Sequence, residues 1–362
     1  MSGLSRRAGL ILISAVGSAA TVAVVATTDE ATEPNLTPSV ADRHAPGERP
    51  APDAPGVLGD GDLTEPRTDA FVGDADGTTI RPTFNWPRGT VARVEFSQTR
   101  ARGDVVTFAN ASRWTLEVRN EPGERLRLEY SDPASVFAAN RRGSIAAPAT
   151  VEGLVPTLIV RSDGSFERIA DDARHLSQLR ELVERTAGQN LSARPALEQT
   201  LLAALRTRSK GEWELWVASW VDQELELGAE YESSADVPLP VPGAGMVHMR
   251  SVSVATGMVP CTVGAHERRC IRIETTSDAD REQLERADPF GMEALLGPEF
   301  RNVAARIVRY QSKTSVVTEP DGLVPHWSEV VRSNTMTYSD AGETKTVSSS
   351  DRLEHRFRYP RP

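Results

Sequence analysis

Two cysteines and one histidine share the stretch VPCTVGAHERRC, as Cys261, His266 and Cys270. Thiolates and imidazoles are zinc ligands, but a structural zinc site takes four ligands and this stretch offers three. A thioredoxin-like redox pair has two residues between its cysteines, whereas eight residues separate this pair. The chemistry to be weighed is therefore a metal site, a redox pair or a structural disulfide.

The flanking sequences favour the disulfide. The stretches VHMRSVSVATGMVPCTV and RRCIRIETTSD are rich in β-branched residues and predict consecutive antiparallel strands. Opposed residues on such strands have Cα atoms about 4.5–5.5 Å apart, which is within disulfide range. We predict a cross-strand disulfide between Cys261 and Cys270, with His266 as an exposed turn residue and no bound metal.

Three tryptophans recur at helical spacing in GEWELWVASWVDQELELG. On a helix, Trp213, Trp216 and Trp220 share one stripe. Such an aromatic stripe usually packs into a core, and the alternative is a wall against which an apolar ligand lies. On the second interpretation, Trp213, Trp216 and Trp220 are the candidate ligand-binding residues.

No catalytic motif is found. The chain lacks a Gly-x-Ser-x-Gly elbow and a Ser-x-x-Lys pair, and no histidine lies within a familiar motif. The fragments GDGD and DADG lack the ligand spacing of a calcium-binding loop. We therefore assign no catalytic residue and no cofactor.

The N-terminal sequence predicts export. Arg6 and Arg7 precede an uncharged run from Ala8 to Ala26, the pattern of a secretory signal peptide. The run is also close to the roughly 20 residues that span a bilayer, so an uncleaved anchor is the alternative. Residues 1–26 are a signal peptide or N-terminal membrane anchor, and the rest is extracytoplasmic: periplasmic, in the cell envelope or secreted.

Residues 27–85 are predicted to be a disordered, acidic and proline-rich linker. They hold 12 carboxylates against 4 arginines, a net charge of −8, and few large apolar residues. The whole chain carries −10 and the first 26 residues +2, so residues 86–362 carry −4. A nearly balanced domain argues against a nucleic-acid partner, which would select a clustered basic face.

Residues 86–362 are predicted to form a single α+β domain. Alternating apolar residues indicate hairpins with turns at 121–124 and 162–164 and a closing meander with turns at 319–322 and 340–343. Helical periodicity follows Asp171 or Asp172, begins again at Pro195 and continues in the tryptophan stretch. We expect a strongly curved, half-barrel-like antiparallel sheet packed against two or three helices.

Three stretches resemble those of uncharacterised exported bacterial proteins of the DUF6263 kind. They are GLVPTLIVRSDGSFERI, WELWVASWVDQELELG and DGLVPHWSEVVRSNTMTYSDAGETKTVSSSDRLEHRFRY. The closing meander is also similar in style to half-barrel lipoprotein carriers of the LolA and LppX kind. That resemblance implies a curved sheet that shields a hydrophobic ligand against helices. Unlike those carriers, this chain has no lipid-anchor cysteine near its start.

Three functional interpretations stay open. The first is a non-enzymatic extracytoplasmic protein that binds an apolar small molecule or lipid between sheet and helices, with the membrane contacted only through the N-terminal segment. The second is an envelope structural or protein-interaction module with a solid core. The third is an enzyme whose site is assembled from scattered polar residues.

Overall fold

The computed structural model describes the strands of the N-terminal segment and most of the chain from Thr79 onward. The described residues are 10–14, 21–25, 79–140, 143–144, 156–187, 195–239, 246–261, 269–286, 290–291, 304–340 and 343–360. His266 and residues 27–78 of the expected linker lie outside these ranges.

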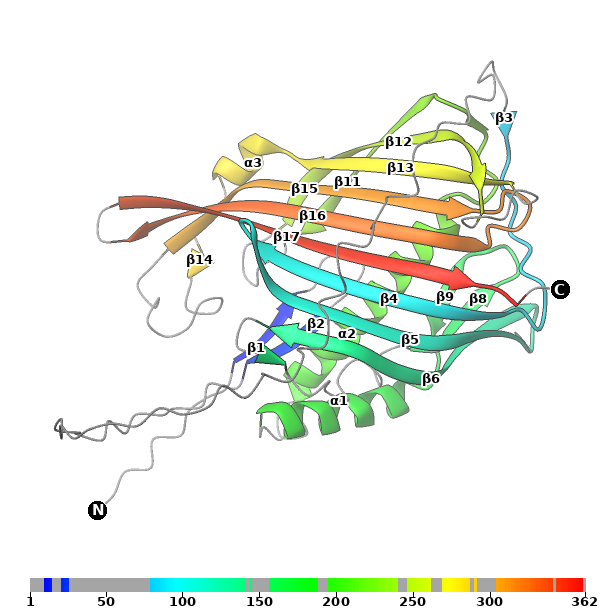
Figure 1. The fold of residues 1–362 in the computed structure, drawn as a ribbon, viewed down its shortest axis with the longest axis horizontal. Helices are drawn as coiled ribbons and strands as arrows, with labels where there is room; N and C mark the ends of the chain where they lie inside the picture. Colours follow the sequence, from blue (N-terminus) through cyan, green and yellow to red (C-terminus); the bar gives the residue numbers. More distant parts are fainter. Residues whose placement is uncertain are drawn as a thin grey trace, which may run out of the picture. The chain divides into compact units, whose positions relative to one another are not determined.

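A large open antiparallel sheet dominates the described residues (Figure 1). Its strands, in spatial order, are β11 (Glu230–Pro238), β12 (Met246–Pro260), β13 (Arg269–Ala279), β15 (Ala304–Thr318), β16 (Pro325–Asp340), β17 (Glu343–Arg358), β4 (Val91–Arg102), β5 (Val105–Glu121), β6 (Arg125–Asn140), β8 (Leu158–Arg161) and β9 (Phe166–Ile169). Two short strands pair beside this path, β7 (Gly143–Ser144) with β6 and β14 (Phe290–Gly291) with β15. The prediction of an antiparallel sheet is confirmed.

The two ends of the domain meet in the middle of the sheet. Strand β17 pairs with β4 over ten residue pairs, from Ser349 opposite Arg102 to Arg358 opposite Arg93. One meander runs from β4 to β9 and a second from β11 to β17, and two helices, Asp172–Ala187 and Pro195–Trp213, lie between them in sequence. Both halves of the chain therefore contribute to one continuous inner surface.

The longer helices follow the first meander. The helices are α1 (Asp172–Ala187), α2 (Pro195–Trp213), the π-helical segment η3 (Glu214–Ala218) and α3 (Arg281–Arg286). In Figure 1, α2 lies behind the sheet, and α1 is seen below the lower edge that β6 forms in this view. Within the described ranges, no helix has the length and apolar character needed to cross a membrane.

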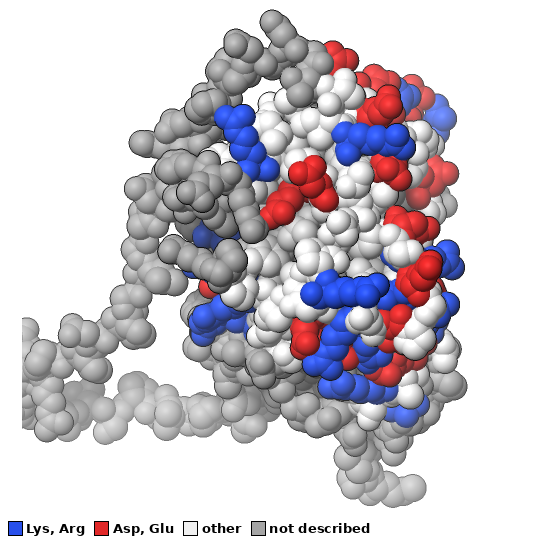
Figure 2. Space-filling view, turned by 90° about the vertical axis from the view of Figure 1, so that its right-hand side faces the viewer, with Lys and Arg blue, Asp and Glu red and all other residues white. Residues whose placement is uncertain are grey.

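The sheet has one buried and one charged face, as the alternating pattern predicts. Alternate residues of β4, Ala92, Val94 and Phe96, are buried toward the helices. The opposite face has cross-strand ion pairs, among them Arg358 with Glu95 at 3.0 Å. Figure 2 shows basic and acidic side chains interspersed at the end of the molecule that it faces. Such exposed pairs add little stability, so this face is primarily a solvated surface.

Two of the buried apolar clusters lie on the inner side of the sheet. The larger one joins β4, β5 and β17 to the tryptophans of α2 and η3. The smaller one surrounds Leu284 of α3 and contains Val247, Met249, Ile307 and Tyr310. Between them, the helix-facing residues of β12 and β13 are hydroxyls, with Ser251 and Ser277 in hydrogen-bond contact at 2.7 Å. The inner surface is therefore apolar at both ends and polar between them.

The expected boundary between linker and domain is wrong. Residues 79–85, assigned to the linker, belong to the folded domain. Strand β3 (Thr79–Ile80) pairs with β10 (Leu225–Glu226), and the amide of Thr83 donates to the carbonyl of Pro320 at 3.1 Å. The Phe84 ring meets Trp213 edge-on, with centroids 5.7 Å apart. These few apolar residues bury enough surface to order a segment of otherwise polar composition.

The helical predictions are confirmed with one difference. The predicted helix after Asp171 is α1, and the helix starting at Pro195 is α2. The tryptophan stretch continues α2 through η3 instead of forming a separate helix. In the N-terminal segment, β1 (Leu10–Ser14) pairs with β2 (Thr21–Val25).

Candidate functional site

The three tryptophans named as candidate ligand-wall residues are part of the core. Trp213, Trp216 and Trp220 are 0%, 2% and 9% exposed. Each indole N–H donates a hydrogen bond: Trp213 to the carbonyl of Gly164 at 2.7 Å, Trp216 to Ser328 Oγ at 3.0 Å and Trp220 to the carbonyl of Leu215 at 2.8 Å. Buried indoles with satisfied N–H groups are typical of structural packing.

The π-helical turn sets the direction of these side chains. The amide of Ser219 donates to the carbonyl of Glu214 at 3.1 Å, which is the i→i+5 bond of a π-helix. The wider turn leaves Trp216 packed edge-on against Phe357 of β17, with ring centroids 5.2 Å apart. The indole of Trp216 thus joins the helical segment to the centre of the sheet.

Charged side chains form a half-buried layer where α2 approaches the sheet. Arg208 and Glu212 pair at 3.1 Å on α2, with side chains only 12% and 16% exposed. On the sheet, Asp351 accepts a 2.8 Å hydrogen bond from Gln98 and lies 3.5 Å from Arg100. Ion pairs this sheltered are screened less by salt than surface pairs are.

Three neighbours of this layer are buried titratable groups. Burial lowers the pKa of His355 to about 4, so the imidazole is neutral at physiological pH. Burial also raises the pKa of Tyr130, and the Glu212 carboxylate acts in the same direction. Desolvation similarly lowers the pKa of Arg332 on β16. Polar groups are therefore concentrated on the inner side of the sheet beside α2.

Two hydrogen-bonding groups of β5 have no partner among the described residues. They are Nε1 of Trp114 and Oγ of Ser112, and their residues are 6% and 2% exposed. The Trp114 ring lies edge-on to Tyr130, with centroids 6.2 Å apart, and 5.8 Å from Phe96. Buried donors are paired in the great majority of cases, so these two mark a place where a polar atom would be stabilised.

Ser328 and His355 make a contact that superficially suggests a nucleophile and its base. Ser328 Oγ lies 3.5 Å from Nδ1 of His355, but it already accepts the bond from Trp216. Ser328 is 0% exposed and His355 5%. A substrate could not reach this hydroxyl without opening the core, so the contact is structural.

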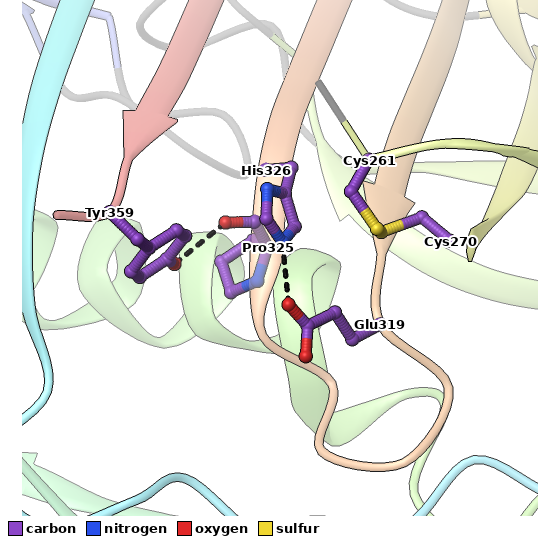
Figure 3. Close-up of a disulfide and its surroundings, with 6 residues drawn as sticks. All are labelled: Cys261, Cys270, Glu319, Pro325, His326 and Tyr359. Atoms are coloured by element: carbon purple, nitrogen blue, oxygen red, sulfur yellow. Dashed lines mark hydrogen bonds and ion pairs between the residues drawn. A yellow bond between two sulfur atoms is a disulfide. The ribbon is translucent and has the colours of Figure 1, made fainter. Parts of the chain in front are cut away.

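The disulfide lies on the other face of the sheet. Cys261 and Cys270 are bonded, with Cα atoms 4.9 Å apart, and both are buried (Figure 3). The expected placement is wrong in one respect, because the cysteines are not directly opposed. Cys270 pairs with Val259, and Cys261 follows the end of β12, so the bond is diagonal. Val317 and Trp327 complete its apolar surroundings.

Among the described residues, the histidine beside this disulfide is His326, and His266 lies outside the described ranges. One ring nitrogen of His326 and both Sγ atoms lie within 4.8 Å of one another. Its Nε2 is 2.8 Å from Oε1 of Glu319, across the turn between β15 and β16 (Figure 3). Sequence spacing could not reveal this contact, because Cys270 lies on β13 and His326 on β16, with β15 between these two strands in the sheet.

A bulge turns His326 toward the sulfurs. Val317 pairs with Trp327 and Thr318 with Pro325, so His326 is an extra residue in β16. A bulge redirects a side chain relative to strict alternation and is frequent near functional sites. Pro325 is also held by the Tyr359 hydroxyl, which donates to its carbonyl at 2.7 Å. The orientation of His326 is therefore fixed by three separate segments.

The remaining described histidines lie apart from these groups. His175 is buried on α1, and His248 on β12 is 3.0 Å from Asp236. A hollow of about 420 Å³ opens at the start of α1, but Asp172 in its wall pairs with Arg206 and Asp171 with Arg127. The hollow is lined mainly by charged residues, and none of the three tryptophans belongs to its wall.

No protein-family model and no curated protein matches the chain. Among solved structures, the chain is similar to one described as lipid–protein interactions in lipovitellin, with a TM-score of 0.36 and 8% identity. The match covers 75% of this chain and 25% of the other, so the chain spans about a quarter of that protein's length. We draw no functional conclusion from a likeness at this level.

Proposed function

We propose that the protein is a non-enzymatic, extracytoplasmic binding protein of the cell envelope, periplasm or secreted fraction. Its ligand is a small amphipathic molecule, lipid-like in its apolar body and carrying a hydrogen-bond acceptor. The ligand lies on the helix-facing side of the sheet, beside the charged layer of α2. The unpartnered, buried Nε1 of Trp114 is the observation that carries this proposal.

The cellular location is supported by the disulfide and the N-terminal sequence together. Disulfides persist in oxidising compartments and are rare in the cytosol. The Cys261–Cys270 bond is buried, and the chain begins with a basic and then uncharged stretch typical of an export signal. The proposal includes residues 1–26 as signal peptide or anchor and residues 27–78 as an acidic tether.

The surroundings of Trp114 support an amphipathic ligand. The rings of Phe96, Tyr130 and His355 lie 5.8, 6.2 and 6.4 Å from its centroid. Ligand sites in proteins combine such apolar walls with a few placed polar groups that fix orientation. An acceptor atom received by Trp114 and Ser112 would satisfy both groups, while the aromatic rings contact the apolar body.

The resemblance to exported domains of the DUF6263 kind and to half-barrel carriers supports the same proposal. A sheet that curves around helices shelters a ligand on its inner side, and here α2 and η3 follow one side of the sheet. A nucleic-acid partner forms no part of it, because the domain is nearly neutral and the visible charges alternate in sign (Figure 2).

Native mass spectrometry of protein purified from its host tests the proposal. We expect a co-purifying small molecule in the wild type and about tenfold lower occupancy in Trp114→Phe, which keeps an aromatic ring but loses the N–H donor. Trp327→Phe is the matched control, because this indole bonds Glu354 on the opposite face. Equal occupancy in both variants, or no bound molecule in the wild type, would contradict the proposal.

A solid-core interaction module is the second candidate. It is favoured by the satisfied indoles of Trp213, Trp216 and Trp220, which fill the space beneath the helices. On this interpretation Trp114→Phe changes stability alone. This candidate would be favoured if the wild type carries no small molecule and Trp114→Phe differs from it only in stability.

A further inference from the structure

A set of potential metal ligands lies on the outer face of the sheet, away from the proposed ligand site. It consists of the two sulfurs of Cys261 and Cys270 and the ring of His326, with Glu319 behind it (Figure 3). The sulfurs and one imidazole nitrogen lie within 4.8 Å of one another. Ligands about 2.0–2.3 Å from a tetrahedral zinc ion are roughly 3.3–3.8 Å apart, so displacements of about 1 Å would suffice.

His326 has the hydrogen-bond arrangement of a metal-binding histidine. Its Nε2 is held by Oε1 of Glu319 at 2.8 Å, while Nδ1 is buried without a partner among the described residues. Metal-binding histidines typically donate one ring N–H to a carboxylate, which fixes the ring and makes the other nitrogen a better ligand. His326 is 6% exposed, so the unpartnered nitrogen has little access to bulk water.

We propose that reduction of the Cys261–Cys270 disulfide creates a zinc site formed by both thiolates and one ring nitrogen of His326. Glu319 is a positioning residue that holds the imidazole, and water occupies the fourth coordination position. Two thiolates with one imidazole are a donor set that favours Zn²⁺ over harder cations. The oxidised pair offers no thiolate, so disulfide and metal are mutually exclusive.

The redox step balances with a dithiol as reductant. The S–S bond breaks as two electrons and two protons pass from the dithiol to the cysteines, and the reductant closes its own disulfide. Binding of Zn²⁺ then releases the two thiol protons to solvent. One cross-link thereby replaces another, and the metal also ties Cys261 and Cys270 to His326 on β16. The site would keep this end of the sheet closed in a reducing environment.

Cobalt binding to the full chain tests the site without reference to any activity. Reduced wild type, freed of excess reductant, should bind one Co²⁺ per chain. We expect the sulfur-to-cobalt charge-transfer band and the intense visible bands of a tetrahedral site, both removed by Zn²⁺. Oxidised wild type should show neither. His326→Gln should weaken binding by about 100-fold, and Glu319→Gln by about tenfold.

His248→Gln is the matched control, because His248 also pairs with a carboxylate but has no cysteine beside it. It should bind cobalt like the wild type. Circular dichroism of each reduced protein reports whether the sheet persists. Reduced wild type that unfolds, or that stays folded without a tetrahedral spectrum, overturns the proposal. An unchanged affinity in both His326→Gln and Glu319→Gln overturns it as well.

Discussion

The indole N–H of Trp216 donates a 3.0 Å hydrogen bond to Oγ of Ser328, which joins the π-helical segment to the middle of the sheet. Both residues are almost fully buried. The bond makes Trp216 a structural link between two halves of the domain. Ser328 Oγ accepts this bond in addition to its contact with His355.

Trp216→Phe should destabilise the domain by about 2–3 kcal/mol, because it leaves Ser328 Oγ without its donor and creates a small cavity. Urea denaturation of the variant and wild type measures the change. A double-mutant cycle with Ser328→Ala isolates the hydrogen bond, for which we expect a coupling of about 1 kcal/mol. Strict additivity of the two substitutions would show that the bond contributes nothing.

Local sequence patterns predict the elements well where one short segment determines them. Gly123 has a φ of 81°, which suits the turn expected between β5 and β6. Pro195 opens α2 at the position where proline is compatible with a helix. Alternation likewise identified the buried side of β4, because a strand with one wet face encodes it in every second residue.

Pairings between distant segments were not predictable in the same way. The contact of β17 with β4 joins opposite ends of the domain, and neither strand specifies its partner by spacing. The bulge at His326 depends on the register between β15 and β16. The cysteines therefore acquire a histidine neighbour, His326, that their own sequence context does not contain.

The charged layer beside α2 was also not predicted. Arg208 and Glu212 read as ordinary solvent-facing helix residues, and Asp351 as a polar strand residue. Only the packing of α2 on the sheet brings them into a half-buried region. Trp213 and Trp216, in contrast, were correctly located on helical segments, whereas Trp220 lies in the turn that follows η3. The burial of all three favours the core-packing interpretation.

His355 should make stability depend on pH in the mildly acidic range. Burial lowers its pKa from 6.5 to about 4 in the folded state. Its contribution is therefore present above about pH 6.5 and is lost as the pH falls toward 4, since the unfolded chain binds the proton first. Between about pH 7 and about pH 5, we expect a loss of about 2 kcal/mol.

Urea denaturation of wild type and His355→Gln at both pH values checks this expectation. The variant should lose most of the pH dependence, although some will remain because burial also lowers the pKa of His175. An equal slope in wild type and His355→Gln would show that this imidazole is not the group responsible.

Removal of the disulfide should lower stability without abolishing the fold. Closure of a loop with a sequence separation of 9 constrains the unfolded chain by about 2–3 kcal/mol. We expect a loss of this size in Cys261→Ala/Cys270→Ala, which leaves no buried hydroxyl. Thermal and urea unfolding measure it, and free-thiol titration of wild type should find none. Unchanged stability would mean that the bond does not constrain the domain.

Replacement of Gly164, in the β8–β9 turn, should destabilise the domain. Its φ of 81° lies in the left-handed region, and an added Cβ would lie 2.9 Å from Cγ2 of Val221 and 3.0 Å from Phe84. Its carbonyl also accepts the Trp213 hydrogen bond. Gly164→Ala should therefore cost about 2–4 kcal/mol, from backbone strain and displacement of core side chains.

Gly103→Ala supplies the comparison that separates these two causes. Gly103 also has a positive φ, 57°, but nothing lies within 4 Å of the place that an added Cβ would take, so only backbone strain of about 1 kcal/mol is expected. Urea denaturation of both variants gives the difference directly. A larger loss for Gly164→Ala, accompanied by a shift in tryptophan fluorescence, locates the excess at the packing of Phe84 and Trp213. Equal losses would show that the turn yields without disturbing the core.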